Sequence, residues 1–193
     1  ILIPATVALL LGACASPEAN PESTRASLQG HSNSASGEGY AEAHKPEGSP
    51  DAEAGFPQQW YDGTAELNAY DLQQERYGQI RRGDAVLIFV TEDFHARDHV
   101  KLDRAPKDPE DAVKVLKLNA VRTFETGVYA YKTMQSVFTP VQLNHHPATL
   151  KSTTSVQEWC GMVFQQLNRN PKGFDARWFS YFQSEGDGST ALT

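Results

Sequence analysis

The strongest constraint on the fold is a pattern that begins at Phe56, where short runs of aromatic and β-branched residues are separated by Gly, Pro, Asn and Asp. This pattern is typical of strands joined by turns. The run 84–91 is apolar at most positions, which predicts a central strand with both faces covered. Because no long helical segments separate the runs, a parallel α/β sheet is not expected. We therefore predict a mainly β fold, a meandering antiparallel sheet whose most curved form is a partial barrel.

Further strands are predicted at 115–122, 127–139, 153–167 and 174–183. The first two should pair with each other across residues 125–127, and the residues 168–173 carry a strong turn signal. The composition of 65–77 fits either a helix or a strand, and we favour the strand.

A short helical turn is predicted near residues 108–114. Asp108 is a suitable cap for such a turn, and Pro109 fits its first position because a backbone N–H is not needed there. At the other end of the chain, the residues 189–193 begin what looks like one more strand. We therefore expect the sequence to be a fragment that lacks its carboxyl end.

The chain starts with an uncharged apolar run, 1–11, which is shorter than the roughly 20 residues that span a bilayer but matches the core of an export signal. The following Leu11-Gly12-Ala13-Cys14 resembles the lipobox of bacterial lipoproteins, in which the cysteine receives a diacylglycerol. The resemblance implies that 1–13 are a signal peptide, truncated at its start, and that Cys14 is the lipid attachment site. An ordinary secretory signal that happens to end before a cysteine is the alternative.

The segment 14–55 is predicted to be a disordered acidic linker that tethers a domain, 56–193, to the membrane. From residue 15 to residue 55 it carries seven carboxylates against Arg25 and Lys45, which is five of the seven net negative charges of the chain. Its large apolar residues are only Leu28 and Tyr40, so it cannot bury enough surface to offset the entropy of ordering.

The envelope of a bacterium is the location that these features predict. Acyl chains on Cys14 would hold the protein on a membrane without a spanning helix. The residue after Cys14 is Ala15 and not Asp. By resemblance to the sorting rule of enteric lipoproteins, the absence of Asp at this position favours the outer membrane over the inner one. The nearly neutral remainder of the chain offers no large basic surface, so we expect no nucleic-acid partner.

The residues from Glu92 to His99 are the first candidates for chemistry, because they gather carboxylates and imidazoles directly after the predicted central strand. His95 and His99, with Asp98 or Glu92, offer the ligand types that zinc prefers. The sequence lacks a His-Glu-x-x-His pattern, and we favour a solvated, charged loop. His145 and His146 could also be metal ligands, and for them too we favour a solvated loop.

Cys160 is the thiol that remains if Cys14 is modified, and it could act as a nucleophile with His145 or His146 as its base. A buried cysteine that simply packs is the reading we favour. Glu158 and Glu185 could form a carboxylate pair for glycoside chemistry, but nothing in the sequence brings them together. We therefore predict no catalytic residue, no metal ligand and no cofactor.

A second resemblance covers most of the chain after Trp60. It is carried by 61–67, 75–78, 90–92 and Val156-Gln157-Glu158-Trp159-Cys160-Gly161. These segments resemble uncharacterised bacterial lipoproteins common in the Bacteroidetes, some of which are labelled septum formation inhibitor Maf, a nucleotide pyrophosphatase family. The Ser-x-Ser-Pro-Arg-Arg motif is absent from this sequence, so the resemblance implies no catalytic role.

The function predicted from the sequence is that of a non-catalytic envelope lipoprotein whose β-rich domain binds an apolar ligand or another envelope protein. The aromatic residues near the end of the chain could line an apolar cavity or form ordinary core: Trp159, Trp178, Phe179, Tyr181 and Phe182. The alternative function is a surface-attached hydrolase that uses Cys160 or the Glu92 to His99 cluster.

Overall fold

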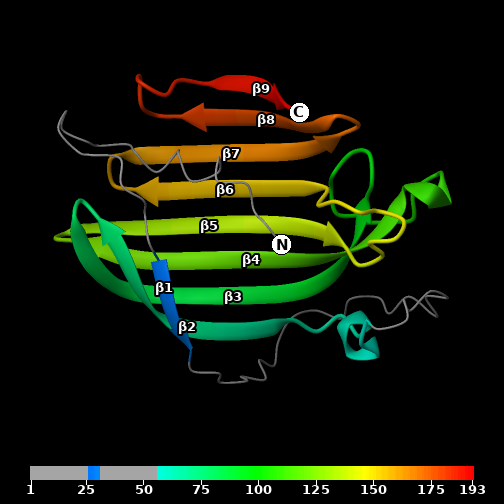
Figure 1. Ribbon diagram of the computed structural model, residues 1–193, viewed down its shortest axis with the longest axis horizontal. Coiled ribbons are helices and arrows are strands. Elements are labelled where there is room, and N and C mark those ends of the chain that lie inside the picture. The colour runs from blue at the N-terminus through cyan, green and yellow to red at the C-terminus, as the bar shows by residue number, and fades with distance from the viewer. Residues whose placement is uncertain (1–25, 31–55) are drawn as a thin grey trace.

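The computed structural model describes residues 56–193 and the backbone of 26–30. They form a nine-stranded antiparallel sheet in which the spatial order of the strands is their order in the chain (Figure 1). The strands are β1 (Ala26–Gly30), β2 (Glu66–Arg76), β3 (Gln79–His95), β4 (Ala112–Thr126), β5 (Tyr129–Pro140), β6 (Lys151–Glu158), β7 (Gly161–Asn170), β8 (Gly173–Ser180) and β9 (Gly188–Leu192). Because β1 and β9 lie at opposite edges, the sheet is open and not a closed barrel. The predicted meandering β fold is confirmed.

Most of the predicted strands are present, with one adjustment. The segment 65–77 is a strand, β2, and β4 pairs with β5 as predicted. The segment 153–167 is not one strand but the hairpin of β6 and β7, because Glu158 pairs with Gly161 and leaves Trp159 and Cys160 as the turn.

The helical turn predicted near 108–114 is the 3-10 helix η3 (Pro109–Asp111). The Asp108 side chain accepts a hydrogen bond from the backbone N–H of Glu110 at 3.1 Å, which confirms its capping role. The turn is shorter than predicted because β4 begins at Ala112. A second 3-10 helix, η2 (Gln58–Tyr61), precedes β2 and contacts β3 through its backbone, where the carbonyl of Trp60 accepts a hydrogen bond from Thr91 Oγ1.

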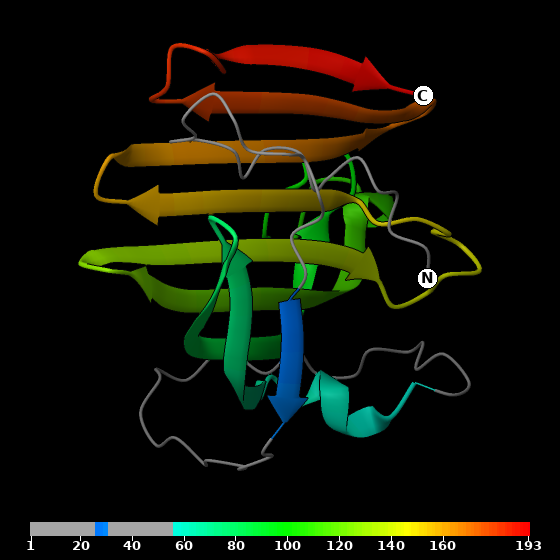
Figure 2. The same ribbon diagram turned by 60° about the vertical axis from the view of Figure 1, so that its left-hand side comes forward.

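The hairpin of β2 and β3 folds back over one face of the sheet, so that its end crosses the middle strands in both views (Figures 1 and 2). Its turn, Tyr77 and Gly78, has positive φ at both residues, the conformation of a two-residue hairpin turn. Gly83 lies where β3 passes closest to β4: a Cβ atom there would lie 2.0 Å from the carbonyl oxygen of Thr123. We call the face under this hairpin the concave face.

Side chains alternate between the two faces along each strand, and each face has its own small core. On the concave face Leu72, Ala85, Phe124 and Tyr131 pack together, and the rings of Phe124 and Tyr131 stack at 5.1 Å. On the opposite face, towards the other end of β3 and β4, the cluster is formed by Phe94, Val113, Val115 and Leu150. The sheet is thus a single layer with buried patches on both faces.

The predicted signal peptide, Cys14 and most of the predicted linker lie outside the described residues. The described part of the linker is β1, whose backbone pairs antiparallel with β2 from Ala26 opposite Gln74 to Gly30 opposite Tyr70.

Candidate functional site

A row of polar side chains crosses the concave face near its centre. Arg122 on β4 lies directly opposite Thr133 on β5, and such neighbours have Cβ atoms about 5 Å apart. On the other side of Arg122 the neighbour on β3 is Ala85, which is small. This gap lets Gln74 reach across from β2, and its Oε1 accepts a hydrogen bond of 3.5 Å from Arg122 Nη1.

The next row of the same face holds a pair of tyrosines. The hydroxyl groups of Tyr77, at the hairpin turn, and Tyr131, on β5, are 2.9 Å apart. The guanidinium carbon of Arg76 lies 4.6 Å from the ring centre of Tyr77 and 5.3 Å from that of Tyr131. Burial, together with hydrogen bonds to Glu158 and Tyr77, raises the pKa of Tyr131 above its ordinary value. Its phenol is therefore neutral in the physiological range and can donate a hydrogen bond.

Several polar atoms on this face are buried without a hydrogen-bond partner among the described residues. They include the Oγ1 atom of Thr133, the Nε atom of Arg81 and the Oε2 atom of Glu158. Thr133 is only 4% exposed and Gln74 also 4%, so bulk water does not cover them. Buried polar groups without partners are uncommon in native proteins, and ordered water or a ligand is the usual explanation. We name the set Gln74, Arg81, Arg122 and Thr133 the concave polar cluster.

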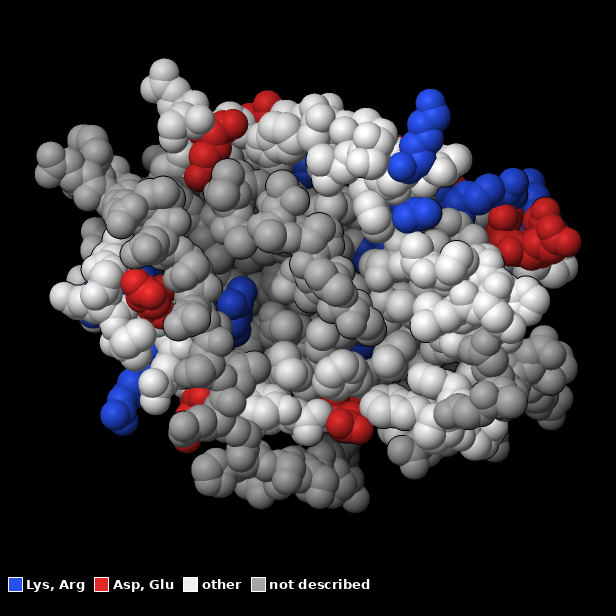
Figure 3. Space-filling model, viewed as in Figure 1, with Lys and Arg blue, Asp and Glu red and all other residues white. Residues whose placement is uncertain are grey.

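Figure 3 views the concave face, and Lys and Arg atoms are visible in its middle as well as at its rim. They are separate rather than gathered in one broad patch. Arg76, Arg81 and Arg122 are all on this face by strand register, and Glu158 is the carboxylate that engages the tyrosine pair. The arrangement can therefore offer hydrogen-bond donors and positive charge to a ligand.

The cluster from Glu92 to His99 is a network of charge pairs at the opposite end of β3. Glu92 lies 3.1 Å from Lys117 Nζ and 3.8 Å from Lys101 Nζ, and Asp93 lies 2.6 Å from Lys114 Nζ. Both carboxylates are thus engaged by lysines. The segment is charged as predicted, but the solvated loop favoured above is wrong for its first half, because Glu92 to His95 belong to β3 and the side chain of Glu92 is only 10% exposed.

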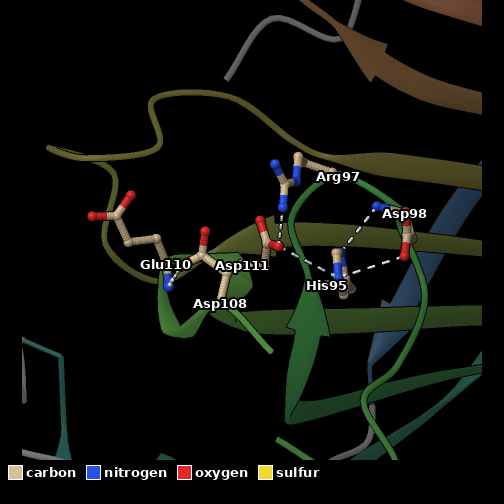
Figure 4. A network of polar contacts seen from close by, with 6 residues as sticks. All are labelled: His95, Arg97, Asp98, Asp108, Glu110 and Asp111. Carbon is tan, nitrogen blue, oxygen red and sulfur yellow. Dashed lines mark hydrogen bonds and ion pairs between the residues drawn. The ribbon is translucent and has the colours of Figure 1, made fainter. Parts of the chain in front are cut away.

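His95 belongs to a second part of this network, which joins the loop after β3 to η3 (Figure 4). Its Nε2 atom lies 3.5 Å from Asp98 Oδ2 and 3.7 Å from Asp111 Oδ2, and Asp111 also binds Arg97. The Nδ1 atom of His95 accepts the backbone N–H of Asp98 at 3.2 Å. The contacts tie the loop to the start of β4, and they account for both ring nitrogens.

His99 does not join His95 in a shared ligand set. It is buried, has a positive φ of 55° and donates its backbone N–H to the carbonyl of His95 at 2.9 Å. Burial lowers the pKa of His99, Lys151 and His95 lower it further, and Asp98 acts in the opposite direction. Within 26–30 and 56–193, no three His, Cys, Asp or Glu side chains are arranged to hold a metal ion.

Cys160 is half-buried in the turn between β6 and β7, so the favoured picture of a fully packed cysteine is only partly met. His145 and His146 lie in the loop between β5 and β6, at the other end of β6. The eight residues of β6 span about 26 Å at roughly 3.3 Å per residue, so neither imidazole is placed to act as a base for the thiol.

Glu158 and Glu185 are at the same end of the sheet, on different elements. Glu185 lies in the loop between β8 and β9 and accepts a hydrogen bond from Ser180 Oγ at 2.5 Å. Glu158 interacts with Tyr131 instead. The two carboxylates engage different partners and show no shared contact in the part of the chain that the structure describes.

The late aromatic residues do not converge on one cavity. Trp159 and Tyr181 are 67% and 73% exposed, and Phe179 is 53% exposed on the face opposite to that of Trp178. Trp159 packs against Tyr129 with ring centres 5.4 Å apart. The ring of Tyr181 covers Gly161 and contacts Phe182 edge-on at 5.5 Å. These residues form small surface contacts at the ends of the hairpins.

The sequence reasoning missed the concave polar cluster, although a signal for it exists. Within the predicted strand 115–122, Arg122 has the same parity as Leu116 and Leu118. In a strand this places a charged side chain on the same face as two leucines. An arginine at an inward position of a strand is the pattern that could have indicated a site.

The comparisons with known proteins add no relative: no protein-family model, no curated protein and no solved structure matches the chain. The description of the protein therefore rests on its own structure, which is an open antiparallel meander with a polar concave face. No helix among the described residues is both long and apolar enough to cross a membrane.

Proposed function

We propose that this protein is a lipid-anchored bacterial envelope lipoprotein whose sheet domain binds a ligand on its concave face and performs no catalysis. The observation that carries the binding role is the concave polar cluster, where Thr133 and Arg81 keep buried polar atoms without partners among the described residues. A native sheet tolerates such groups where a ligand or ordered water completes them. The anchor at Cys14 rests on the lipobox resemblance alone.

The alternative function, a surface-attached hydrolase, has less support. Cys160 and the imidazoles of His145 and His146 lie at opposite ends of β6. His95 is held by Asp98 and Asp111, which leaves it no free ring nitrogen for a substrate. The sites that would carry hydrolysis are therefore separated or already engaged, whereas the concave cluster has unused hydrogen-bonding groups.

The anchor is tested by expressing the chain with a complete export signal and following its partition into a detergent phase. The parent protein should enter the detergent phase and the membrane fraction, and Cys14→Ala should move it to the aqueous phase because the acyl chains are lost. Cys160→Ala is the matched control and should partition like the parent. Unchanged membrane association of Cys14→Ala would refute the anchor.

The binding role is tested by a ligand screen on the whole chain with the melting temperature as readout, since a ligand that binds only the folded state raises it. Hits are then mapped by backbone amide shifts, which should change along β3 to β6. Turnover of ester, phosphoester or glycoside substrates that is lost in Cys160→Ala or His95→Ala would favour the hydrolase instead.

A further inference from the structure

The guanidinium of Arg122 lacks a counter-charge in the part of the chain that the structure describes. Its one hydrogen bond there is the long one, 3.5 Å, to Gln74 Oε1, and no carboxylate forms an ion pair with it. Burial lowers its pKa, which reflects the cost of holding the charge away from water. A guanidinium has five N–H donors, so most of the donors of Arg122 remain available. Arg122 is half-buried, and a charge partly removed from water is more stable when a group of opposite charge completes its hydrogen bonds.

Two further groups of the concave polar cluster also have incomplete hydrogen bonding among the described residues. Thr133 is the direct neighbour of Arg122, and Arg81 is linked to Arg122 through Gln74. Thr133, directly opposite on β5, has a buried hydroxyl without a partner. Arg81 on β3 lies opposite Gln74 and has a buried Nε atom without one. Gln74 itself is engaged at both ends, because its Nε2 atom donates to the carbonyl of Glu75 at 3.1 Å and its Oε1 atom accepts from Arg122. The unused groups are thus mainly donors.

All of these groups would be completed by a hydrogen-bond acceptor that carries negative charge. An oxyanion meets it, because several lone pairs on one small group can accept from a guanidinium and a hydroxyl together. Glu158 is a carboxylate on the same face; it interacts with Tyr131, and its Oε2 atom has no hydrogen-bond partner among the described residues. Three arginines, Arg76, Arg81 and Arg122, share the face with it, so the local field favours an anion.

We propose that Arg122 and Thr133, with Arg81 from the overlying hairpin, form a binding site for the oxyanion group of a ligand, a carboxylate or a phosphate. The inference rests on the concave-face binding proposed above and names its ligand chemistry. The curl of the β2–β3 hairpin is what builds the site, since it brings Gln74, the cross-strand neighbour of Arg81, into contact with Arg122 on β4.

The test uses the whole chain and two probes, inorganic phosphate and acetate, each titrated against chloride at constant ionic strength. Backbone amide shifts of β4 and β5 and the Arg122 Nε signal are the readouts. We expect saturable shifts centred on Arg122 and Thr133 for at least one probe. Saturation by phosphate alone identifies a tetrahedral anion, and saturation by acetate alone identifies a carboxylate.

Thr133→Val is the decisive variant, because it removes a hydroxyl that has no hydrogen-bond partner among the described residues and keeps the volume of the side chain. It should fold as stably as the parent and bind the anion about tenfold more weakly, the effect of losing one hydrogen bond to a charged group. Thr123→Val, next to Arg122 but on the other face of β4, is the matched control and should bind like the parent. Arg122→Gln should abolish saturation, whereas Arg177→Gln, an exposed site on β8, should not.

Equal affinity in the parent and Thr133→Val, or shifts that rise linearly with either probe, would overturn the oxyanion site. If Arg122→Gln fails to fold, the threonine pair decides alone. A neutral ligand from the screen that binds the concave face equally well with Arg122→Gln would overturn this inference and leave the proposed function intact. If neither the two anions nor the screened ligands shift any amide signal on the concave face, both the oxyanion site and the proposed binding function are refuted.

Discussion

At the scale of single residues, His99 combines an unusual backbone with a buried titratable ring. Its φ of 55° belongs to the left-handed region, which non-glycine residues enter at some cost except Asn and Asp. The carbonyl of His99 accepts a hydrogen bond from Lys151 Nζ at 3.0 Å, which links the loop after β3 to β6. The residue thus holds the loop in place while its ring stays out of water.

We predict that His99 makes the protein acid-sensitive. Because its pKa is lowered in the folded state, the unfolded chain takes up a proton first as the pH falls below about 6.5. The contribution of neutral His99 to the free energy of unfolding is therefore fully present above that pH. It is lost as the pH falls towards the pKa of His99 in the folded state. His99→Asn should remove this part of the slope and keep the left-handed turn.

The measurement is urea unfolding of the whole chain between pH 7.5 and 5, conditions chosen to bracket about 6.5. His145→Asn, in an exposed loop, is the control and should keep the slope of the parent. Identical slopes for the parent and His99→Asn would contradict the assignment.

At the scale of the elements, the close approach of β3 and β4 depends on Gly83. Besides the Thr123 carbonyl oxygen, a Cβ atom there would lie 2.7 Å from the Cβ atom of Phe124. Glycine inside a strand often marks such a close backbone approach. The position therefore fixes how the hairpin leaves the plane of the sheet.

We predict that Gly83→Ala destabilises the protein by about 1–3 kcal/mol or more, because the backbone of β4 must move to admit the methyl group. Asp84→Ala, at the exposed neighbouring position, should change stability by less than about 0.5 kcal/mol. Urea unfolding measures both. Gly83→Ala should also disturb the amide signals of Gln74 and Arg122. A variant as stable as the parent would show that β3 and β4 can move apart at this position without cost.

At the scale of the whole molecule, the single-layer sheet is stabilised by two small cores on opposite faces. Leu72 and Phe94, each 1% exposed, represent them. The strands β3 and β4 contribute side chains to both cores and connect them through continuous backbone pairing. The two cores should therefore unfold together.

We predict that Leu72→Ala costs about 2–5 kcal/mol and Phe94→Ala about 3–5 kcal/mol, both within one cooperative transition. Val128→Ala, at a position that is 72% exposed, is the control and should cost less than about 0.5 kcal/mol. Coincident transitions by circular dichroism and tryptophan fluorescence check this. Two separate transitions would mean that the faces fold independently.

We also predict a protease-resistant core that begins near Phe56, where the acidic composition gives way to the strand pattern, because the five residues of the edge strand β1 do not by themselves protect the chain ahead of that core. Limited proteolysis followed by mass spectrometry locates its start. A resistant fragment that begins well before Ala26 would instead indicate that the segment before the sheet is tightly packed.

The features that could be predicted from the sequence alone are local ones. Strand positions followed from β-branched and aromatic runs, the cap at Asp108 from its side chain, and the turn at 168–173 from its residues, where Asn170 Oδ1 accepts the backbone N–H of Lys172 and of Gly173. Each depends on neighbours within a few residues. The division of 153–167 into β6 and β7 was not predicted, because Trp159 and Cys160, which form the turn, are not typical turn residues.

Which face of the sheet curls inward, and which side chains meet there, depends on contacts between distant parts of the chain. Gln74 and Arg122 are 48 residues apart and sit on strands that are not neighbours, so their contact depends on the curl of a hairpin and on the small residues of β3 between them. Strand alternation assigns side chains to two faces but does not say which stretch of a face will be covered. The concave polar cluster therefore follows from sheet curvature, which arises from the packing of all the strands together.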